Sequence, residues 1–335
     1  MKKTIWFDIT NVPHVNFLLP IVEHYKDDFN YLFSIRDFAE TKALFEKKIG
    51  REYFEIGKHH GKNKFKKVFG MLQRTKELSK LIPDFDVAIS LGGMSPNFIA
   101  KHRKKRAVTF DDNEKSANWI YAPFSDLAFW PNVISRDALL HQHFKEESIY
   151  QYNGYKEEFY LADYKPDESF LKSLPFDKYV VVRAENMKAS YVSGTQTVVP
   201  ELVKLLNEAG VNVLFLPRYE SDREYAKNFG NVFMPDGAVN GLDACYFSDA
   251  VLTGAGTMAR EAACLGIPAV SFYAGSDLLT VDKSLVDAGK MFFSRNPENI
   301  MNFLKDSKRG SANLQHCKSV QNEIFEQLDN VLYNL

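Results

Sequence analysis

Residues 251–273, VLTGAGTMAREAACLGIPAVSFY, constrain the fold more than any other stretch of the chain. An apolar strand is followed by a Gly-Ala-Gly turn, a helix and a second strand, at residues 251–253, 254–256, 258–265 and 269–273. Glycine permits the tight turn, and Gly266 and Pro268 end the helix. Strand, helix and strand in this order predict a parallel βαβ unit. The N-terminus of its helix then lies at the carboxyl edge of the sheet.

The turn before this helix has two interpretations. The N–H groups and positive dipole end of the helix favour an anion, most often a phosphate. We expect Thr257 to cap the helix, and Glu261, one turn in, to accept hydrogen bonds from sugar hydroxyls. However, GAGT lacks the full GxGxxG and GK[ST] patterns of nucleotide sites. Spacing alone therefore favours a phosphate site and a purely structural turn equally.

The same alternation of strand and helix runs through both halves of the 335 residues. We therefore expect an α/β protein with two Rossmann-like, doubly wound parallel-sheet domains that face each other across a cleft. The first domain would span residues 1–165 and the second residues 176–314, with a linker over residues 152–175. A C-terminal helix at 315–335 is expected to pack back toward the first domain.

Composition excludes several classes of protein. The formal net charge is −1, so no overall positive field selects a nucleic acid. The three cysteines show no metal-ligand spacing and indicate reduced thiols in a cytoplasmic protein. No stretch is apolar and long enough to cross a bilayer, and the opening MKKTIWFDIT lacks a signal-peptide core. The neighbours His59 and His60 cannot easily face one metal ion. We therefore expect neither a metal nor a cofactor.

Ligands of doubly wound sheets bind beyond the carboxyl ends of the strands. In the first half these ends carry Asn11–His14, Gly92–Ser95 and Asp111–Glu114. His14, at the start of a helix, would be a base near neutral pH, although spacing alone favours a packing or capping histidine. Clustered carboxylates raise one another's pKa, which suits Asp111, Asp112 and Glu114 to acid–base work. The alternative is a helix cap followed by first-turn acids.

The strand ends of the second half carry a second group of polar residues. Arg183, Glu185 and Asn186 follow one strand, and Arg218 follows the next. Together with the turn after residue 253, they would form a binding surface for a phosphorylated ligand.

The Lys62–Leu72 stretch combines lysines with aromatic and aliphatic residues at helical spacing. Such a helix is typical of peripheral contact with an anionic membrane surface. The alternative is an ordinary surface helix whose apolar stripe lies in the core, and the sequence favours this alternative modestly.

Four segments carry a family resemblance: WFDITNVPHVNF, TFDDNEKSANWIYAPFSDLAFWPN, VVRAEN and GAGTMAREAACLGIPAVSFY. They resemble the DUF354 family, and the two-domain pattern over nearly the whole chain resembles the GT-B fold. Related GT-B groups are the non-hydrolysing UDP-N-acetylglucosamine 2-epimerases and the transferase that adds N-acetylglucosamine to the lipid-linked peptidoglycan precursor.

The resemblance implies roles for individual residues. VRAEN is similar to the HRREN segment that approaches uridine diphosphate in the epimerases, with Val182 in place of the leading histidine. Gly256 and Thr257 match the turn that holds diphosphate oxygens, and Glu261 matches the carboxylate that binds the ribose in the transferases. The remaining expected binding residues are Asn11 in the first half and Arg218, Gly254 and Met258 in the second half.

The resemblance also bears on the catalytic groups. Asp111, Asp112 and Glu114 fall near the acidic segment that the epimerases use for acid–base work. His14 falls where many GT-B transferases place a histidine. Gly92 and Gly93 stand where the epimerases carry a Gly-Asp pair, so a catalytic aspartate is missing, which counts against epimerase chemistry.

The sequence thus predicts a metal-independent glycosyltransferase that uses a nucleotide sugar, with UDP as the expected nucleotide, in the synthesis of cell-surface glycan. Its acceptor would be a glycan or a lipid-linked molecule, and its location the cytoplasm or the inner face of the membrane. One alternative is a UDP-sugar 2-epimerase-like enzyme. A second is a non-catalytic protein that binds nucleotide sugars.

Overall fold

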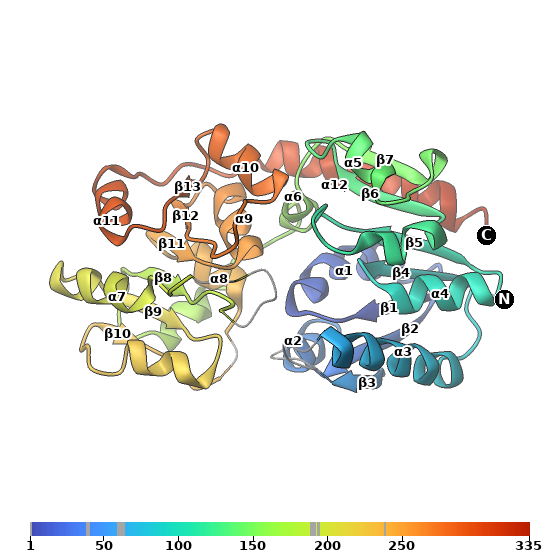
Figure 1. Ribbon diagram of the computed structural model, residues 1–335, viewed down its shortest axis with the longest axis horizontal. Helices are drawn as coiled ribbons and strands as arrows, with labels where there is room; N and C mark the ends of the chain where they lie inside the picture. The colour runs from blue at the N-terminus through green and yellow to red at the C-terminus, as the bar shows by residue number, and fades with distance from the viewer. Residues whose placement is uncertain (1, 38–40, 59–63, 188–191, 193–194, 238) are drawn as a thin grey trace. The chain divides into compact units, whose positions relative to one another are not determined.

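The computed structural model describes residues 2–37, 41–58, 64–187, 192, 195–237 and 239–335. The chain divides into two compact units: unit 1 comprises residues 1–163 and 315–335, and unit 2 comprises residues 164–314. Each unit holds one parallel sheet covered by helices (Figure 1). The predicted fold class, two Rossmann-like parallel-sheet domains, is confirmed.

Unit 1 is built on a seven-stranded sheet in the order β3-β2-β1-β4-β5-β6-β7, and all its strand pairs are parallel. Its strands are β1 (Thr4–Ile9), β2 (Asn30–Asp37), β3 (Phe54–Lys58), β4 (Val87–Leu91), β5 (Arg106–Phe110), β6 (Leu127–Pro131) and β7 (Ile149–Tyr152). Three of the central strands, β1, β4 and β5, are almost wholly buried and consist mainly of apolar and β-branched residues, the exceptions being Asp8, Ser90 and the exposed Arg106.

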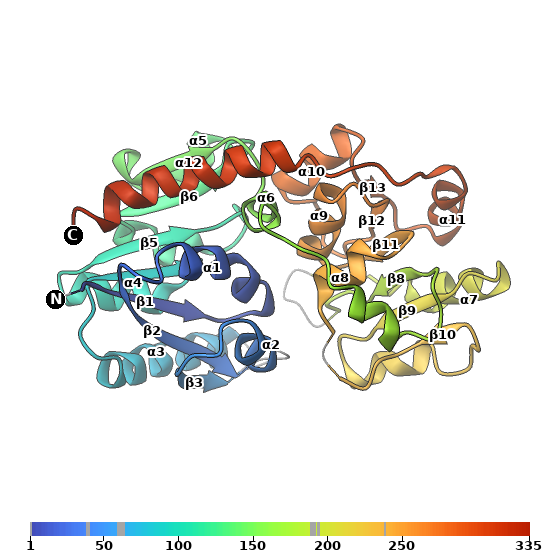
Figure 2. The same ribbon diagram turned by 180° about the vertical axis from the view of Figure 1, so that it is seen from behind.

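The helices of unit 1 cover both faces of this sheet (Figures 1 and 2). They are α1 (Val12–His24), α2 (Thr41–Lys48), α3 (Lys64–Leu81), α4 (Met94–His102), α5 (Arg136–His141), α6 (Lys156–Leu161) and α12 (Leu314–Leu332), with the short helices η1 (Asn118–Ile120), η2 (Ala122–Phe124) and η3 (Glu146–Ser148). The order of the sheet reverses direction after β3, and right-handed crossovers therefore place α3 and α4 on the opposite face from α1 and α2.

Unit 2 is built on a six-stranded parallel sheet in the order β10-β9-β8-β11-β12-β13. Its strands are β8 (Val180–Arg183), β9 (Val213–Leu216), β10 (Val232–Phe233), β11 (Ala250–Thr253), β12 (Ala269–Ser271) and β13 (Phe292–Phe293). Its helices are α7 (Val199–Glu208), α8 (Gly241–Tyr246), α9 (Gly256–Cys264), α10 (Thr280–Asp287) and α11 (Pro297–Asp306), with η4 (Glu168–Ser173) and η5 (Glu220–Tyr225).

The expected linker over residues 152–175 is wrong in its first part. Strand β7 ends at Tyr152, and α6 follows with every residue buried, including Lys156 and Glu157. Charged residues in a helix ordinarily indicate solvent, which is why the sequence pattern misled. The linker is shorter than expected because unit 2 begins at Tyr164.

The C-terminal helix α12 packs on unit 1, where it contacts the end of α1 and α6 (Figure 2). The Tyr25 hydroxyl donates to Asp329 at 2.6 Å, and the His24 ring stacks on Phe325 with centroids 4.0 Å apart. Phe325 also contacts Phe159 of α6, with centroids 5.4 Å apart. The last residues of the chain thus complete the core of the unit that the first residues begin.

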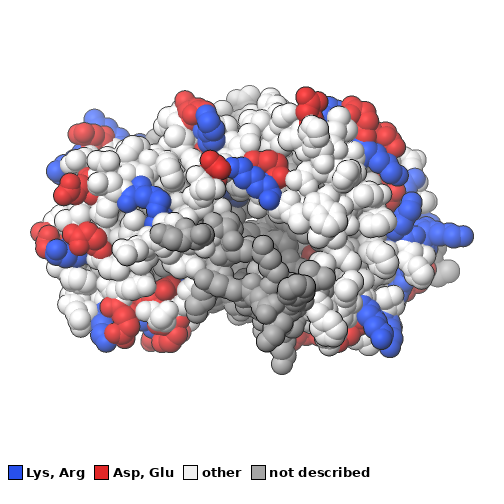
Figure 3. Space-filling model, in the orientation of Figure 1, with Lys and Arg blue, Asp and Glu red and all other residues white. Residues whose placement is uncertain are grey.

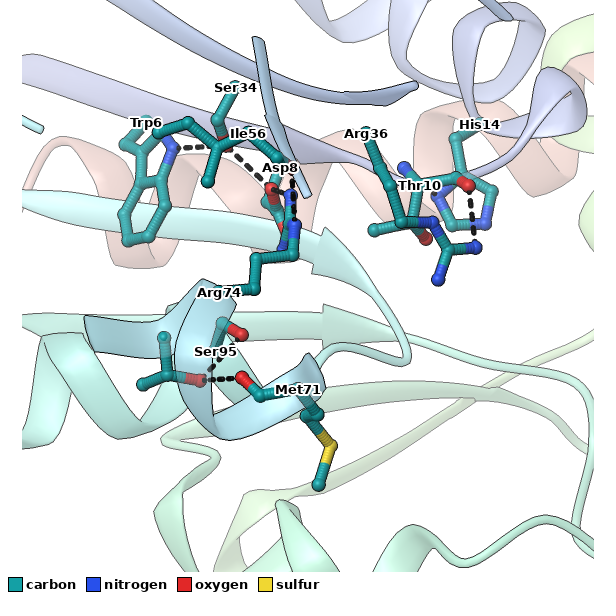
Figure 4. Close-up of polar contacts among 11 residues, drawn as sticks. Trp6, Asp8, Thr10, His14, Ser34, Arg36, Ile56, Met71, Arg74 and Ser95 are labelled. Carbon is teal, nitrogen blue, oxygen red and sulfur yellow. Dashed lines mark hydrogen bonds and ion pairs between the residues drawn. The ribbon is translucent and has the colours of Figure 1, made fainter. Parts of the chain in front are cut away.

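A buried ion pair ties three strands of unit 1 to α3 (Figure 4). The Arg74 guanidinium donates two hydrogen bonds to Asp8 of β1, at 2.6 and 3.0 Å, and its Nε donates to the Ile56 carbonyl of β3. Ser34 of β2 donates to Asp8 at 2.5 Å, and the Trp6 indole donates to Ser34 at 2.9 Å. A guanidinium that is only 8% exposed is therefore fully used by a carboxylate and a carbonyl.

Removing one partner of this pair leaves a buried charge without compensation. We expect Arg74→Met to lower the free energy of unfolding of unit 1 by about 3 to 5 kcal/mol. The exposed pair of Lys42 with Glu55, 2.9 Å apart, is the matched control, and Lys42→Met should cost far less, because water screens an exposed pair. Urea denaturation followed by circular dichroism measures both, and equal losses would contradict the prediction.

Candidate functional site

The polar loops of unit 1 gather because β1, β4 and β5 are neighbours in the sheet. Their carboxyl ends deliver Asn11–His14, Gly92–Gly93 and Asp111–Glu114 to one edge. An added Cβ at Gly92 would lie 2.6 Å from Oδ2 of Asp111, so the loops after β4 and β5 touch. The predicted grouping of these residues therefore agrees with the structure.

His14 lies in the first turn of α1, and 8% of its surface is exposed. The Thr10 amide donates to its Nδ1 at 3.5 Å, and the Asn11 side-chain nitrogen lies 3.4 Å from its Nε2. Burial, together with the Lys156 ammonium, lowers the pKa of His14 to about 3. The imidazole is therefore neutral at physiological pH and much less basic than the sequence suggested.

Asp111, directly after β5, is a carboxyl group whose pKa is raised. Its Oδ1 accepts the amides of Asp112 and Asn113 at 2.8 and 3.0 Å, and its Oδ2 accepts the Tyr121 hydroxyl at 2.5 Å. Burial and the neighbouring Asp112 carboxylate nevertheless raise the pKa of Asp111 to about 6. No helix starts after β5 among these residues, so the alternative of a helix cap is wrong.

Asp112 has a different partner, Lys156 at the start of α6. Its Oδ2 lies 2.7 Å from the Lys156 ammonium, and both side chains are at most 10% exposed. The sequence analysis missed Lys156, because a lysine in an expected linker gives no signal of burial. Glu114 is partly buried, and its carbonyl accepts the Gln142 side-chain amide at 3.1 Å.

The space beside the two glycines after β4 is occupied by the neighbouring residues Asp111 and Pro96. Gly92 has φ = +65°, and any side chain there would overlap the Asp111 carboxylate. An added Cβ at Gly93 would lie 3.1 and 3.2 Å from ring carbons of Pro96. A side chain is excluded at Gly92 in this backbone, and at Gly93 it would require the Pro96 ring to shift by a few tenths of an ångström.

In unit 2, the turn after β11 leads directly into α9, as predicted. The expected cap is wrong, because α9 begins at Gly256 and its N-cap residue is Ala255, which makes no side-chain cap. Thr253 Oγ1 instead accepts the Ala255 amide at 2.8 Å. The first turn of α9 holds no acidic residue. Its dipole end is therefore uncapped by side chains and compatible with an anion.

Gly254 is required by packing. An added Cβ would lie 2.4 Å from Cγ and 2.8 Å from Cα of Glu185. Glu185 is 1% exposed and accepts hydrogen bonds from the Thr197 hydroxyl, the Val198 amide and the Arg295 guanidinium, at 2.5, 3.2 and 3.3 Å. The buried Glu185 side chain therefore packs against Gly254, and its carboxylate binds protein groups. This does not fit its predicted role as a ligand-binding side chain.

The other predicted residues of this surface lie at the same edge of the sheet. Arg183 pairs in register with Thr253, and its guanidinium donates to the Pro217 carbonyl at 3.2 Å. The Asn186 side chain accepts the Tyr219 hydroxyl, and the Arg218 amide donates to Asp222 at 2.9 Å. Met258 is partly exposed. The loops after β8, β9 and β11 thus meet around the N-terminus of α9.

A second buried ion pair lies beneath this turn and was not predicted. The Arg260 guanidinium donates to Asp282 of α10 at 2.7 Å, and it lies 3.4 Å from Thr257 Oγ1. An added Cβ at Gly256 would lie 2.9 Å from Arg260 NH1, so glycine is needed there too. Glu261 is 5% exposed. The pKa of the Cys245 thiol is raised mainly by its own burial and secondly by the negative charge of Glu261.

A metal centre or a membrane-spanning helix would show itself, in the described part of the chain, as clustered ligand side chains or as a long apolar helix. That part contains no cluster of three or more His, Cys, Asp or Glu side chains suited to a metal ion. None of its helices is long and apolar enough to cross a membrane. His59 and His60, to which no metal was assigned, lie outside the described residues.

The chain is similar to one described protein family over nearly its full length. The family described as "Protein of unknown function (DUF354)" matches residues 3–333. An uncharacterized protein of Methanocaldococcus jannaschii is 28% identical over 343 aligned positions, which cover 98% of each protein.

Solved structures share the fold across both units. The UDP-GlcNAc 2-epimerase of Methanocaldococcus jannaschii, in complex with UDP-GlcNAc and UDP, superposes with a TM-score of 0.73 at 15% identity, covering 97% of this chain and 99% of that one. A putative UDP-N-acetylglucosamine 2-epimerase of Listeria monocytogenes gives 0.73 at 13%, covering 100% and 98%. The glycotransferase of kitacinnamycin gives 0.57 at 11%, covering 96% and 95%.

The raised pKa of Asp111 gives a pH dependence of stability with a definite sign. The folded state binds this proton more tightly than the unfolded chain, because the pKa rises from 3.8 to about 6 on folding. Relative to Asp111→Asn, the parent should therefore lose stability as pH rises from about 4 to 6, with a constant difference above pH 7. Urea unfolding of both proteins from pH 4 to 8 measures this, and a flat difference throughout would refute it.

The contact of Gly254 with Glu185 predicts the cost of a single methyl group. Gly254→Ala should destabilise unit 2 by about 1 to 3 kcal/mol, because the Glu185 backbone must move. Gly230→Ala is the matched control, since no heavy atom lies within 4 Å of a Cβ added there. Differential scanning calorimetry compares them, and an equally mild effect at both positions would contradict the packing argument.

Proposed function

The chain belongs to the DUF354 family, and from this premise we propose that it is a nucleotide-sugar enzyme, in the first place a metal-independent glycosyltransferase of cell-surface glycan synthesis. Unit 2 would bind the donor diphosphate, and unit 1 would bind the acceptor, a glycan or a lipid-linked molecule. UDP is the proposed nucleotide.

The observation that carries the proposal is the uncapped N-terminus of α9. Its first turn offers backbone N–H groups at Gly256 and Thr257 and holds no acidic residue of its own, and the nearby Asp282 carboxylate is paired with Arg260. Arg183 lies on the neighbouring strand β8, in register with Thr253 of β11. A helix dipole and a guanidinium together can stabilise a departing diphosphate without a metal ion. Glu261 would bind the ribose.

The acid–base step is best assigned to Asp111. A base is most effective when its pKa lies near the working pH, and the pKa of Asp111 is raised to about 6, whereas that of His14 falls to about 3. Asp111 would take the proton of the acceptor hydroxyl. Asp112 would remain ionised, since it is paired with Lys156. His14, with Asn11, would contact the ligand as a neutral ring.

A second candidate, a UDP-sugar 2-epimerase-like enzyme, is favoured by one observation. The epimerases are similar to both units at once, with TM-scores up to 0.73, whereas the glycotransferase reaches 0.57. Against it, glycines stand at positions 92 and 93, where the epimerases carry a Gly-Asp pair, and Val182 stands where the epimerases have a histidine. A non-catalytic nucleotide-sugar binding protein would keep only the unit 2 site.

A thermal-shift panel of UDP, GDP and CDP sugars tests the donor site. A ligand at a hundredfold excess over its Kd stabilises the folded state by about 2.7 kcal/mol, so the melting temperature of the parent should rise with its donor. Glu261→Gln, which keeps the side-chain size, should abolish the rise. Glu208→Gln is the control, because Glu208 ends α7 and lies at the opposite edge of the sheet. No rise with any sugar would overturn the proposal.

The product then separates the candidate reactions. An epimerase converts the nucleotide sugar to its isomer with nothing else added, whereas a transferase releases the nucleoside diphosphate only when an acceptor is present. Asp111→Asn should lower either turnover at least about hundredfold while leaving the thermal shift intact. A shift without any turnover in the parent would identify the non-catalytic binding protein.

A further inference from the structure

The face of unit 1 that carries α3 and α4 exposes an unusual set of large apolar side chains. Phe69 and Leu72 of α3 are 69% and 52% exposed, Phe98 of α4 is 44% exposed, and Trp119 of η1 is 58% exposed. We call these four residues the α3–α4 patch. Among the described residues, three of the four exposed Phe and Trp side chains belong to it, the fourth being Phe293.

The four residues share one face because of the topology. The connections from β3 to β4, from β4 to β5 and from β5 to β6 all run in the same direction across the sheet, so right-handed crossovers put α3, α4 and η1 on the same side. Ser95 Oγ of α4 lies 2.8 Å from Thr75 Oγ1 of α3, which sets the two helices side by side. Figure 3 shows a broad area without coloured charges on this face of unit 1.

Phe69 and Leu72 of α3 do not serve the core, although the sequence modestly favoured that role for their stretch. They lie one turn apart on the solvent side, while Leu78 and Arg74 on the other side are buried. Single exposed apolar residues are common, but several large ones on one face, aromatic ones among them, mark an interaction surface.

The charge of the same segment indicates the partner. The sequence from Lys62 to Lys76 contains five lysines, one arginine and no acidic residue. The arginine is Arg74, which is used in the buried pair with Asp8. Lys64, Lys66 and Lys67 belong to the first turns of α3, directly before Phe69, and Lys76 is exposed one turn after Leu72. Lysines bordering aromatic and aliphatic side chains complement an anionic lipid surface.

We propose that the α3–α4 patch docks unit 1 on an anionic lipid bilayer, with Phe69, Leu72, Phe98 and Trp119 entering the interface and the positive charge of the lysine-rich sequence up to Lys76 attracting the anionic headgroups. This inference goes beyond the proposed function and does not rest on it, since it concerns neither the donor turn of unit 2 nor the Asp111 cluster. For an enzyme with a lipid-linked acceptor, such docking would bring unit 1 to the membrane that holds the acceptor.

Vesicle co-sedimentation of the full chain tests the docking. Binding should be weak on pure phosphatidylcholine, should increase with added phosphatidylglycerol, and should fall between 50 and 300 mM salt because salt screens the lysines. The pair of changes Phe69→Ser and Leu72→Ser should reduce the vesicle partition coefficient at least about tenfold, because burying such side chains contributes about that factor or more.

Matched controls separate docking from general loss of apolar or positive surface. The pair Leu81→Ser and Leu314→Ser removes side chains of similar exposure, 54% and 55%, from the far end of α3 and from the start of α12, and should bind like the parent. Changing Lys64, Lys66 and Lys67 to Gln should remove the preference for phosphatidylglycerol. The same change at the exposed lysines Lys165, Lys172 and Lys178 should not.

Three results would overturn the proposal. The first is no binding to any vesicle, and the second is equal binding by the patch variants and their controls. The third is a dimer in analytical ultracentrifugation that the Phe69→Ser change dissociates, because a second copy of the chain would then occupy the patch. Circular dichroism of every variant confirms folding. Vesicle binding can be absent while a nucleotide sugar still raises the melting temperature, and vesicle binding can be present while no sugar does so. The two proposals are therefore tested separately.

Discussion

In both units every described strand pair is parallel, so each strand delivers its following loop to the same edge of its sheet. All the candidate chemistry of the protein depends on this constraint. In unit 1 it brings together residues that lie about a hundred positions apart, such as His14 and Asp111. In unit 2 it sets Arg183 beside the turn that starts α9. The sheet of unit 1 is itself held by the pair of Asp8 and Arg74, which joins β1 to α3 and, through the Ile56 carbonyl, to β3.

Burial gives similar side chains at the edge of unit 1 different properties. Asp111 and Asp112 are adjacent in sequence, yet Asp112 forms an ion pair with Lys156 while Asp111 has its pKa raised to about 6. The same lysine, with burial, keeps His14 neutral. A pair of carboxyl groups whose environments differ in this way is a common basis of acid–base catalysis. This is why the proposed function assigns the proton transfer to Asp111 rather than to the histidine.

Gly254 and Gly256 of unit 2 show that one turn can serve both packing and anion binding, so the two interpretations of this turn do not exclude each other. Gly254 leaves room for Glu185, and Gly256 leaves room for Arg260, so both are required by packing. The same small residues keep the first turn of α9 clear of side chains. The same glycines can therefore pack against Glu185 and Arg260 on one side of the turn and leave the helix N-terminus open to an anion on the other side. The similarity to UDP-GlcNAc 2-epimerases, which extends over both units, shows the shared fold, and the choice of reaction rests on the proposed assays.

The sequence by itself determined the two parallel α/β units, most strand ends and the loops that carry Asp111, Arg183 and Gly256, because hydrophobic periodicity and glycine positions are local signals. It could not determine the partners of those residues. Lys156, Tyr121, Arg260 and Asp282 come from distant segments, and burial of a charge leaves no local pattern. The pKa values of His14 and Asp111 and the exposure of Phe69 and Leu72 were likewise decided only by the tertiary structure. Solvation depends on which elements pack around a side chain, and that is fixed only when the whole sheet is assembled.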